Sequence, residues 1–146
     1  MYRGALPHYR IDGTVYFVTW RLEKSQPDLA PAERSTVVDV LSFFDAIRYQ
    51  LYAYVVMNDH VHVVVQPEHG MSLERIIHSW KSYSATKLQK EFGRKNKIWQ
   101  KEYFDRILRN DRELEEKMQY IRNNPIKRWP DCVRYEWLSG NDFVIW

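Results

Sequence analysis

Cysteine and long apolar runs are scarce in this chain of 146 residues. The single cysteine, Cys132, cannot by itself form a disulfide framework or a cysteine-based zinc site. No run of about 18 apolar residues occurs, which excludes a transmembrane helix. The N-terminus also lacks the apolar stretch of about 7–15 residues that a secretory signal peptide requires. These absences predict a soluble, cytoplasmic protein.

Apolar and aromatic residues are nevertheless plentiful. Hydrophobic residues make up 45% of the chain and aromatic residues 15%, whereas disordered chains are poor in aromatics. A domain commonly contains roughly 100–200 residues, so the length predicts one domain over 1–146.

Basic residues are concentrated in the second half of the chain. Residues 1–74 hold 6 basic and 9 acidic side chains, whereas residues 75–146 hold 16 basic and 10 acidic ones. The segment 75–101 contains eight basic residues and one acid, and 117–128 contains four basic residues and no acid. Such blocks are typical of a protein that binds a polyanion such as nucleic acid. Solvated lysine-rich helices would look the same, so charge alone leaves both interpretations open.

Hydrophobic periodicity predicts four strands and three helices. The predicted strands cover 15–22, 50–57, 60–66 and 98–108, and the predicted helices cover 32–48, the segment from N-cap Ser72 to Gly93, and a last segment from Asp111 to about Pro125. The order βαββαβ, followed by a helix, predicts an α+β, ferredoxin-like antiparallel sheet with an additional C-terminal helix. That helix must lie on the second face of the sheet or at its edge.

Two histidines alternate with valines on the third predicted strand. Because side chains alternate across a strand, Val61, Val63 and Val65 point to one face, and His60 and His62 point to the other. The two imidazoles lie about 6–7 Å apart along the strand and can converge on one metal ion. A short His-x-His pattern also occurs in ordinary half-exposed strands, so both interpretations stay open.

The last predicted helix offers partners for such a site. Tyr120 and Asn124 are four residues apart and therefore lie on one helix face. The amide oxygen of Asn124 can act as a third metal ligand, and the Tyr120 phenol would then be a nucleophile one turn away. Lys117 and Arg122 could neutralise a phosphate. Each residue alone has an ordinary alternative, since most of the ten tyrosines will pack in the fold and Asn-Pro often ends a helix.

Several segments together resemble the single-tyrosine, histidine–hydrophobic–histidine transposases. The histidine strand reads VVMNDHVHVVVQP, and the last strand and helix read WQKEYFDRILRNDRELEEKMQYIRNNPIKR. The first strand, YFVTWRL, and the segment KSYSA in the second helix are similar to that family as well. The resemblance covers about residues 12–130, and the YIxxNP pattern in a short chain is most similar to the REP-associated tyrosine transposases of the IS200-like type. Residues 131–146 form a tail to which the sequence assigns no role.

The resemblance implies a metal-dependent transposase that cuts single-stranded DNA near hairpins such as REP-like elements. His60, His62 and Asn124 match the family's ligands for Mg²⁺ or Mn²⁺, and Tyr120 matches its nucleophile. Attack on the scissile phosphate would give a 5′-phosphotyrosine link and a free 3′-hydroxyl, and reversal would rejoin the strand without ATP. The implied location is the nucleoid DNA of the cytoplasm. The implied oligomeric state is a monomer or a homodimer. Tyr120 would meet the histidines of its own chain or, in a homodimer, those of a partner.

The two basic blocks supply the expected DNA-binding residues. Lysine and arginine side chains neutralise phosphates, so a hairpin ligand would give them a function. The expected contacts come from Lys81, Lys87, Arg94, Lys95, Lys97, Arg109, Lys117 and Arg122.

Two positions beside the histidine pair depart from the family pattern. Asp59 stands where many relatives have asparagine, and Asn58 stands in place of proline. Strand alternation predicts that Asp59 points away from the metal and has little effect on catalysis. The remaining histidines, His8, His69 and His78, are expected to be surface or packing residues.

Three other functions fit parts of the sequence. A DNA or RNA hairpin-binding protein that has lost catalysis would stack unpaired bases on an open sheet face carrying Phe17, Trp20, Tyr52 or Tyr54. The intact set of histidines, tyrosine and asparagine argues against that loss. A histidine-triad nucleotide hydrolase would need a third histidine where Val64 stands. A purely structural module would leave both basic blocks unexplained.

Overall fold

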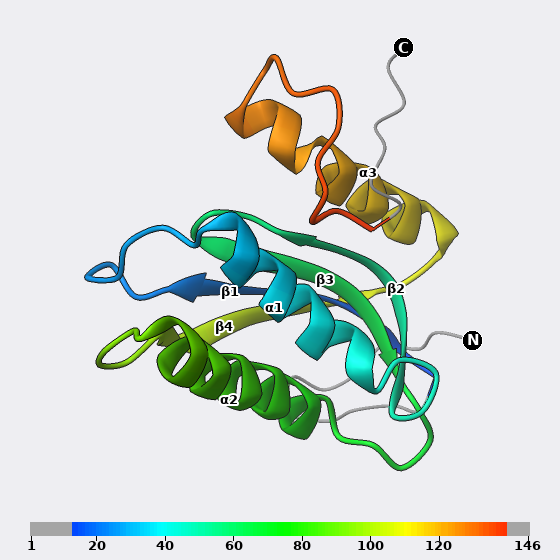
Figure 1. The fold of residues 1–146 in the computed structure, drawn as a ribbon. Coiled ribbons are helices and arrows are strands. Elements are labelled where there is room, and N and C mark those ends of the chain that lie inside the picture. Colours follow the sequence, from blue (N-terminus) through cyan, green and yellow to red (C-terminus); the bar gives the residue numbers. More distant parts are fainter. Residues whose placement is uncertain (1–12, 140–146) are drawn as a thin grey trace.

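A four-stranded antiparallel sheet forms the centre of the molecule, with helices on both of its faces (Figure 1). The computed structural model describes residues 13–139. In chain order the elements are β1 (Val15–Leu22), α1 (Pro31–Phe43), β2 (Tyr49–Val56), β3 (His60–Pro67), α2 (Leu73–Phe92), β4 (Trp99–Leu108) and α3 (Asp111–Arg128). The strands lie in the order β2-β3-β1-β4. The predicted ferredoxin-like α+β fold is therefore confirmed.

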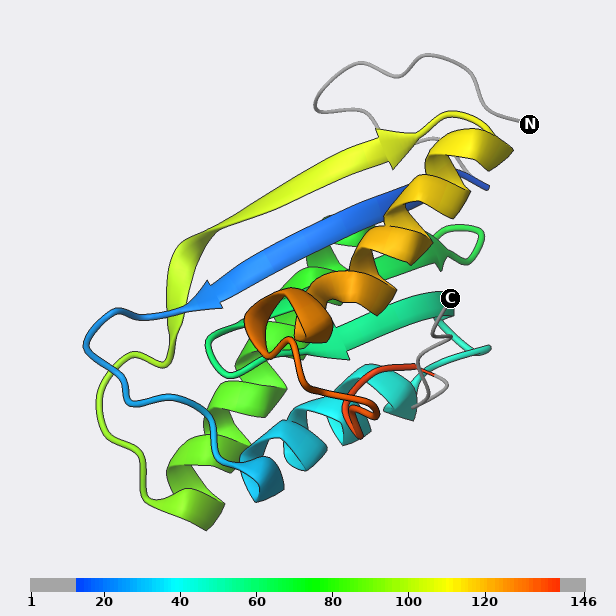
Figure 2. The same ribbon diagram turned by 90° about the horizontal axis from the view of Figure 1, so that it is seen from above.

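Helices α1 and α2 cover one face of the sheet, and α3 lies over the other (Figures 1 and 2). The sequence allowed the additional helix to lie on the second face of the sheet or at its edge, and in the structure it lies on the second face. Seen from above, α3 lies over the middle of the sheet, and most of β4 extends beyond it (Figure 2). None of these three helices, within residues 13–139, has the length and apolar character needed to cross a membrane.

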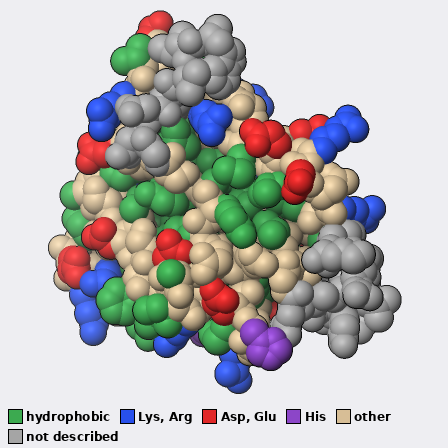
Figure 3. Space-filling model, turned by 90° about the vertical axis from the view of Figure 1, so that its right-hand side faces the viewer, with side chains coloured by type: hydrophobic (Ala, Val, Ile, Leu, Met, Phe, Trp, Pro, Cys, Tyr) green, Lys and Arg blue, Asp and Glu red, His purple; other side chains and the backbone are tan. Residues whose placement is uncertain are grey.

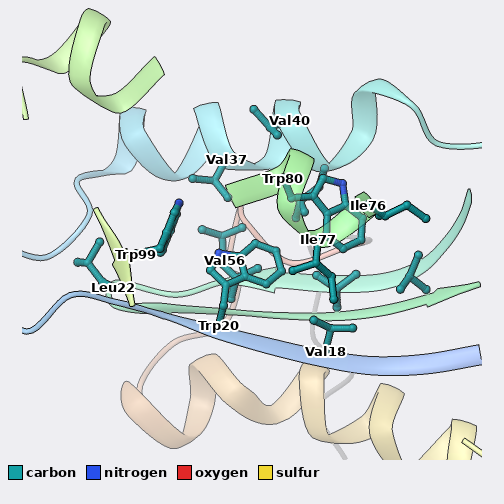
Figure 4. Packing of buried hydrophobic residues seen from close by; sticks show 14 of the residues in the cluster. Val18, Trp20, Leu22, Val37, Val40, Val56, Ile76, Ile77, Trp80 and Trp99 are labelled. Atoms are coloured by element: carbon teal, nitrogen blue, oxygen red, sulfur yellow. The ribbon is translucent and has the colours of Figure 1, made fainter. Parts of the chain in front are cut away.

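Aromatic and branched side chains fill the space between the sheet and helices α1 and α2 (Figure 4). Trp20 of β1 stacks on Trp80 of α2 with ring centroids 5.7 Å apart, and both side chains are almost fully buried. The valines that alternate with the histidines on β3 belong to the same cluster and are fully buried: Val61, Val63 and Val65. The predicted division of β3 into a core face and a histidine face is therefore confirmed.

Helix α1 is shorter than its apolar pattern predicts. The pattern favours a helix over 32–48, whereas α1 ends at Phe43. Ala46 adopts the left-handed backbone conformation, with φ 69°, which a right-handed helix cannot contain. Its N–H donates to the carbonyl of Tyr49 over 2.7 Å. Residues 44–48 therefore form a turn into β2, although the apolar periodicity continues through them.

Helix α3 begins and ends differently from the prediction. Its N-cap is Asn110, and the predicted cap, Asp111, is the first helical residue. The helix also continues past Pro125 to Arg128. Proline lacks an N–H, but the last turn still closes because Trp129 donates its N–H to the carbonyl of Pro125 over 2.7 Å.

Residues 129–139 extend the outer edge of β2. The N–H of Val56 donates to the carbonyl of Trp137 over 2.9 Å, and the hydroxyl of Tyr135 donates to the carbonyl of Val56 over 2.7 Å. These bonds tie the end of α3 to the sheet and help to set the position of the helix over it. The rest of the tail, 140–146, lies outside the described residues.

Candidate active site

Four side chains that the sequence predicts as partners meet between β3 and α3. The imidazoles of His60 and His62 lie side by side, with ring centroids 4.7 Å apart. Nε2 of His60 is 3.1 Å from Oδ1 of Asn124, and the ring centroid of Tyr120 is 5.3 Å from that of His62. The structure therefore brings the predicted nucleophile and the three predicted ligands together within one chain.

Strand alternation and helical spacing place these groups. Val64 follows the two histidines on the same face of β3 and is buried beneath α3. Ile121 of α3 belongs to the same apolar cluster and is 1% exposed. Ile121 anchors the helix, so its neighbours Tyr120 and Asn124 are held against the histidines.

Each histidine has a further polar partner at Nδ1. Oδ1 of Asp59 lies 2.7 Å from Nδ1 of His60, and Oγ1 of Thr19 lies 2.7 Å from Nδ1 of His62. Such contacts orient an imidazole ring and leave its Nε2 as the nitrogen available to a metal ion.

The position of Asp59 corrects the prediction from strand alternation. That rule places its side chain away from the histidines, but β3 begins at His60 and Asp59 belongs to the preceding turn. A turn residue does not follow strand alternation, so the carboxylate reaches the next side chain along the chain. An ionised carboxylate only accepts hydrogen bonds. It therefore favours a proton on Nδ1 of His60 and a free lone pair on Nε2.

Burial keeps His62 uncharged. Its side chain is almost fully buried, and the loss of hydration, reinforced by electrostatic interactions with His60, Arg21 and Lys117, lowers its pKa to about 3. Neutral imidazole is the form that binds metal ions. His62 is therefore in its ligand form throughout the physiological pH range.

The phenol of Tyr120 is open to solvent and lies among positive charges. The residue is 39% exposed, so a DNA strand can reach it. Nζ of Lys117 lies 5.2 Å, and Nζ of Lys127 5.6 Å, from the centre of its ring. Both ammonium groups favour negative charge at this place. The sequence prediction included Lys117 but missed Lys127, whose position seven residues after Tyr120, on the same helix face, was the available signal.

The donor atoms suit a divalent cation. His60 and His62 offer imidazole nitrogens, and Asn124 offers an amide oxygen. Carbonyl and water oxygens suit Mg²⁺ and Mn²⁺, and imidazole binds many divalent metals. No group of three or more His, Cys, Asp and Glu side chains within residues 13–139 is arranged to hold a metal. A cation here therefore needs the amide of Asn124, with oxygens of water or phosphate as further ligands.

Arg94 has a structural role, which corrects its place among the predicted DNA contacts. Its side chain is 6% exposed, and its Nη2 lies 2.8 Å from Oε1 of Glu33. The guanidinium also donates to the carbonyls of Pro27 and Asp28. The hydrogen bonds from Arg94 lower the pKa of Glu33. The guanidinium is therefore engaged inside the protein, where it joins the α2–β4 loop to the β1–α1 loop.

The other predicted DNA-binding residues lie in three places. Two belong to α3, where Lys117 lies beside Tyr120 and Arg122 donates to Gln119. Lys81 and Lys87 belong to α2 on the opposite side of the sheet, and three residues are exposed in loops (Lys95, Lys97 and Arg109). Lys81 donates to the carbonyls of Gln100 and Lys101, and burial lowers its pKa. On the face shown in Figure 3, acidic and basic side chains are interspersed, so its described part presents no continuous basic surface.

The four aromatic residues of the hairpin-binding alternative do not form a common open face. Trp20 is buried under α1 and α2. Phe17 lies on the site face but is 4% exposed, because it packs between His62 and α3. Tyr54 packs against the helix-side core, and Tyr52 alone is exposed. Base stacking on this set is therefore excluded in the described fold.

Sequence reasoning missed two residues of β1 that belong to the site. Thr19 contacts His62, and Arg21 lies opposite His60 in the pairing of β1 with β3. Both occupy alternate positions of the strand, on the face opposite Trp20. Alternation along β1 was therefore a signal that could have located them.

The remaining histidines lie away from the site. His69 and His78 are exposed, as predicted. His8 lies outside the described residues, so its prediction stays untested.

Sequence comparison relates the chain to known transposases. The family model described as "Transposase IS200 like" matches residues 36–124. A protein of Haemophilus influenzae, provisionally named a REP-associated tyrosine transposase, is 28% identical over 99 residues. The alignment covers 61% of this chain and 56% of that protein, so the chain spans little more than half of the relative's length.

Two solved structures share the fold. A REP-associated tyrosine transposase bound to a REP hairpin matches with a TM-score of 0.74 and 20% identity, over 94% of this chain and 82% of that one. A protein of Deinococcus radiodurans R1, provisionally named a transposase, matches with a TM-score of 0.58 and 19% identity, over 84% of this chain and 97% of that one. At such identities the structural similarity concerns the fold. The family match extends over more than half of the chain and includes all four residues of the site, and the protein belongs to the IS200-like transposase family.

Proposed function

We propose that the protein is a divalent-metal-dependent endonuclease and strand transferase that cuts single-stranded DNA beside hairpins through a 5′-phosphotyrosine intermediate. One observation carries the proposal: the exposed phenol of Tyr120 lies beside His60, His62 and Asn124 of its own chain. Each residue type is common alone. A nucleophile beside two imidazoles and an amide oxygen meets the needs of metal-assisted phosphoryl transfer.

Tyr120 would carry out the covalent step. Its phenol oxygen forms a bond to the scissile phosphorus, and the bond between phosphorus and the 3′ oxygen breaks. The 3′ oxygen leaves with the electron pair and takes up a proton, while the phenol proton passes to solvent. The products are a 5′-phosphotyrosine and a free 3′-hydroxyl. Attack by another 3′-hydroxyl reverses the step and rejoins DNA without ATP.

His60, His62 and Asn124 would hold the cation, Mg²⁺ or Mn²⁺. When bound, the cation polarises a phosphoryl oxygen and offsets the charge that develops on it. Asp59 and Thr19 would keep the two imidazoles in the orientation and tautomer that binding needs.

The proposed substrate is a single DNA strand with a hairpin. Two observations support it: the fold neighbour was solved in complex with a REP hairpin, and basic side chains surround Tyr120. REP-like hairpins are therefore the first DNA to test. Because Tyr120 meets the histidines of its own chain, one protomer would suffice for cleavage, and the homodimer is not required.

The test is a denaturing gel of the protein with hairpin DNA from around its own gene, in Mn²⁺ and in chelator. The DNA carries its label at the 3′ end, because the fragment downstream of the cut is the one that joins Tyr120. We expect a metal-dependent protein–DNA adduct that Tyr120→Phe abolishes. The control Tyr83→Phe changes an exposed tyrosine of α2, on the other side of the sheet, and should give the wild-type yield.

Each other outcome changes a different part of the proposal. An adduct formed by Tyr120→Phe would overturn the assignment of the nucleophile. Equal yields in Mn²⁺ and in chelator would overturn the role of the metal. Tight hairpin binding by the wild type with no adduct in either Mg²⁺ or Mn²⁺ would favour the catalytically inactive hairpin-binding protein.

A further inference from the structure

The part of the sheet beyond α3 carries further side chains on the same face as the site. Most of β4 extends past the helix (Figure 2). In the pairing of β1 with β4, Phe104 lies opposite Thr19, and Arg106 lies opposite Phe17. Directly opposed residues of antiparallel strands share a face, and both Thr19 and Phe17 contact His62. Phe104 and Arg106 therefore share the face of the site.

Phe104 and two arginines are exposed on this face. Phe104 is 55% exposed, and Arg106 is exposed two residues along β4. Arg21 is exposed on β1, beside the histidines. Both arginine side chains are therefore accessible to an incoming ligand. A single exposed phenylalanine is ordinary, but here two available guanidinium groups flank it next to a reactive site.

We propose that Phe104, Arg106 and Arg21 form a binding surface for the single-stranded DNA that adjoins the scissile phosphate. Phe104 stacks on an unpaired base, and the two guanidinium groups bind neighbouring phosphates. A duplex does not fit this role, because its bases already stack on one another. The inference rests on the proposed function, since it assigns this strand to the substrate of Tyr120.

The spacing suits an extended strand that leads to the nucleophile. Neighbouring strands lie about 4.8 Å apart, so Phe104 is roughly 10 Å from the backbone of the histidine strand across β1. One or two nucleotides span that distance. Along β4, Phe104 and Arg106 are about 6.7 Å apart, close to the separation of successive phosphates in an extended strand.

A second copy of the chain is the competing occupant. β4 is an edge strand, and an open edge can pair with another strand. Two guanidinium groups lie on this surface, and Lys117 and Lys127 lie beside Tyr120 on the same side of the sheet. A polyanion is attracted by the same groups, so charge favours DNA.

Fluorescence anisotropy in chelator tests the surface without cleavage. The ligands are a hairpin with a single-stranded flank and the same hairpin without it. We expect the wild type to bind the flanked hairpin more tightly, and Phe104→Ala to weaken that binding about tenfold while the blunt hairpin binds as before. Phe104→Trp keeps a ring and should retain the affinity. The matched control Phe43→Ala removes an exposed phenylalanine of α1, on the other side of the sheet.

Two further readouts separate stacking from charge. A 2-aminopurine base in the flank should lose fluorescence on binding to the wild type and keep it with Phe104→Ala, because stacking on the ring quenches it. Arg106→Gln and Arg21→Gln should each reduce the slope of log affinity against log salt by about 0.7 for the flanked hairpin.

Two binding results would contradict the proposed binding surface. Equal affinity of the wild type for flanked and blunt hairpins would do so, as would full affinity of Phe104→Ala. A change in mass by light scattering with Phe104→Ala, without a change in affinity, would assign the face to a second copy instead.

The adduct assay separates this inference from the proposed function. If the wild type forms the adduct but binds flanked and blunt hairpins equally well, the proposed binding surface is rejected and the proposed cleavage activity stands. The opposite result is flank-dependent binding that Phe104→Ala abolishes, without an adduct in the wild type. It would reject the proposed cleavage activity and support the binding surface.

Discussion

The two faces of the sheet are built from the same four strands but have different contents. The face under α1 and α2 is a continuous apolar core, in which Trp20 stacks on Trp80. The face under α3 has a smaller apolar cluster, beside which His60, His62 and Thr19 hold polar contacts. One face excludes water, and the other keeps the Tyr120 phenol exposed.

The difference teaches that one strand can serve stability and chemistry at once. On β3, the valines complete the core and the histidines form the candidate site. Because neighbouring residues point to opposite faces, a substitution on one face is expected to change unfolding, and one on the other to change activity. The following variants test that separation.

Tyr120→Phe should produce the largest change in activity with almost none in stability. Only a partly exposed phenol oxygen is lost, so we expect no detectable adduct and a free energy of unfolding within about 0.5 kcal/mol of the wild type. Adduct gels and urea unfolding measure the two quantities. A large loss of stability would mean that the face of α3 is also structural at this position.

His62→Ala and His60→Ala should remove most of the Mn²⁺ binding, because each variant deletes one of the two imidazoles proposed as ligands. Mn²⁺ titration followed by electron paramagnetic resonance measures this without DNA. His78→Ala, which changes an exposed histidine of α2, is the matched control and should bind as the wild type does. Unchanged binding by either site variant would reject its role as a ligand.

Trp80→Ala should show the opposite pattern. Trp80 is 2% exposed, and its indole N–H donates to the hydroxyl of Tyr49 over 2.9 Å. We expect a loss of about 3–5 kcal/mol in the free energy of unfolding, with Mn²⁺ affinity of the folded protein retained. A large fall in metal affinity would show that the two faces are coupled.

Glu33→Gln tests the buried ion pair that joins the first turn of α1 to the α2–β4 loop. Hydrogen bonds from Arg94 lower the pKa of Glu33 below its ordinary 4.5. The pair's stabilisation is therefore complete above about pH 4.5 and is lost as the pH falls through the lowered pKa. The variant should be about 3–5 kcal/mol less stable at pH 7, and the difference should shrink in acid. Urea unfolding over a pH series measures it, and parallel pH curves would contradict the pairing.

Asp59→Asn should have the smallest effect. The amide can still accept a hydrogen bond from Nδ1 of His60, but it removes a negative charge next to the ligand. We expect Mn²⁺ affinity to fall about tenfold, at the lower end of such effects, with stability unchanged. Asp59→Ala should weaken it further. Equal Mn²⁺ affinity in the wild type, Asp59→Asn and Asp59→Ala would support the sequence-based prediction that Asp59 has little effect.

Local chemistry made most element positions predictable. The hydroxyl of Ser72 caps α2, and Gly93 ends it with φ 73°, as the residue types indicate. The apolar pattern of α1 misplaced its end, since Phe44 and Ile47 continue the periodicity in a turn. Periodicity reports which residues are apolar, whereas the left-handed backbone at Ala46 depends on how the chain enters β2.

The candidate site was predictable for a different reason. Alternation on β3 and four-residue spacing on α3 are local rules, and the family resemblance supplied the pairing of the two elements. Contacts at element ends escaped these rules: Asp59 reaches His60 from a turn, and Arg94 reaches Glu33 of α1 from the α2–β4 loop. A basic residue in a basic block has the same sequence signal whether it is buried in an ion pair or open to DNA.

By itself, the sequence determined the strand and helix order, the division of β3 into two faces, and the four residues of the site. The element order and the two faces follow from periods of two and of about 3.6 residues, which act along one segment at a time, whereas the family resemblance joined Tyr120 and Asn124 to the histidines as a candidate site. The tertiary structure alone decided that α3 lies over the second face and that Tyr120 meets the histidines of its own chain. It also decided which charges are buried and that, within residues 13–139, most of β4 extends beyond α3 on the face of the site. Such facts depend on distances between segments far apart in the chain, which only packing sets.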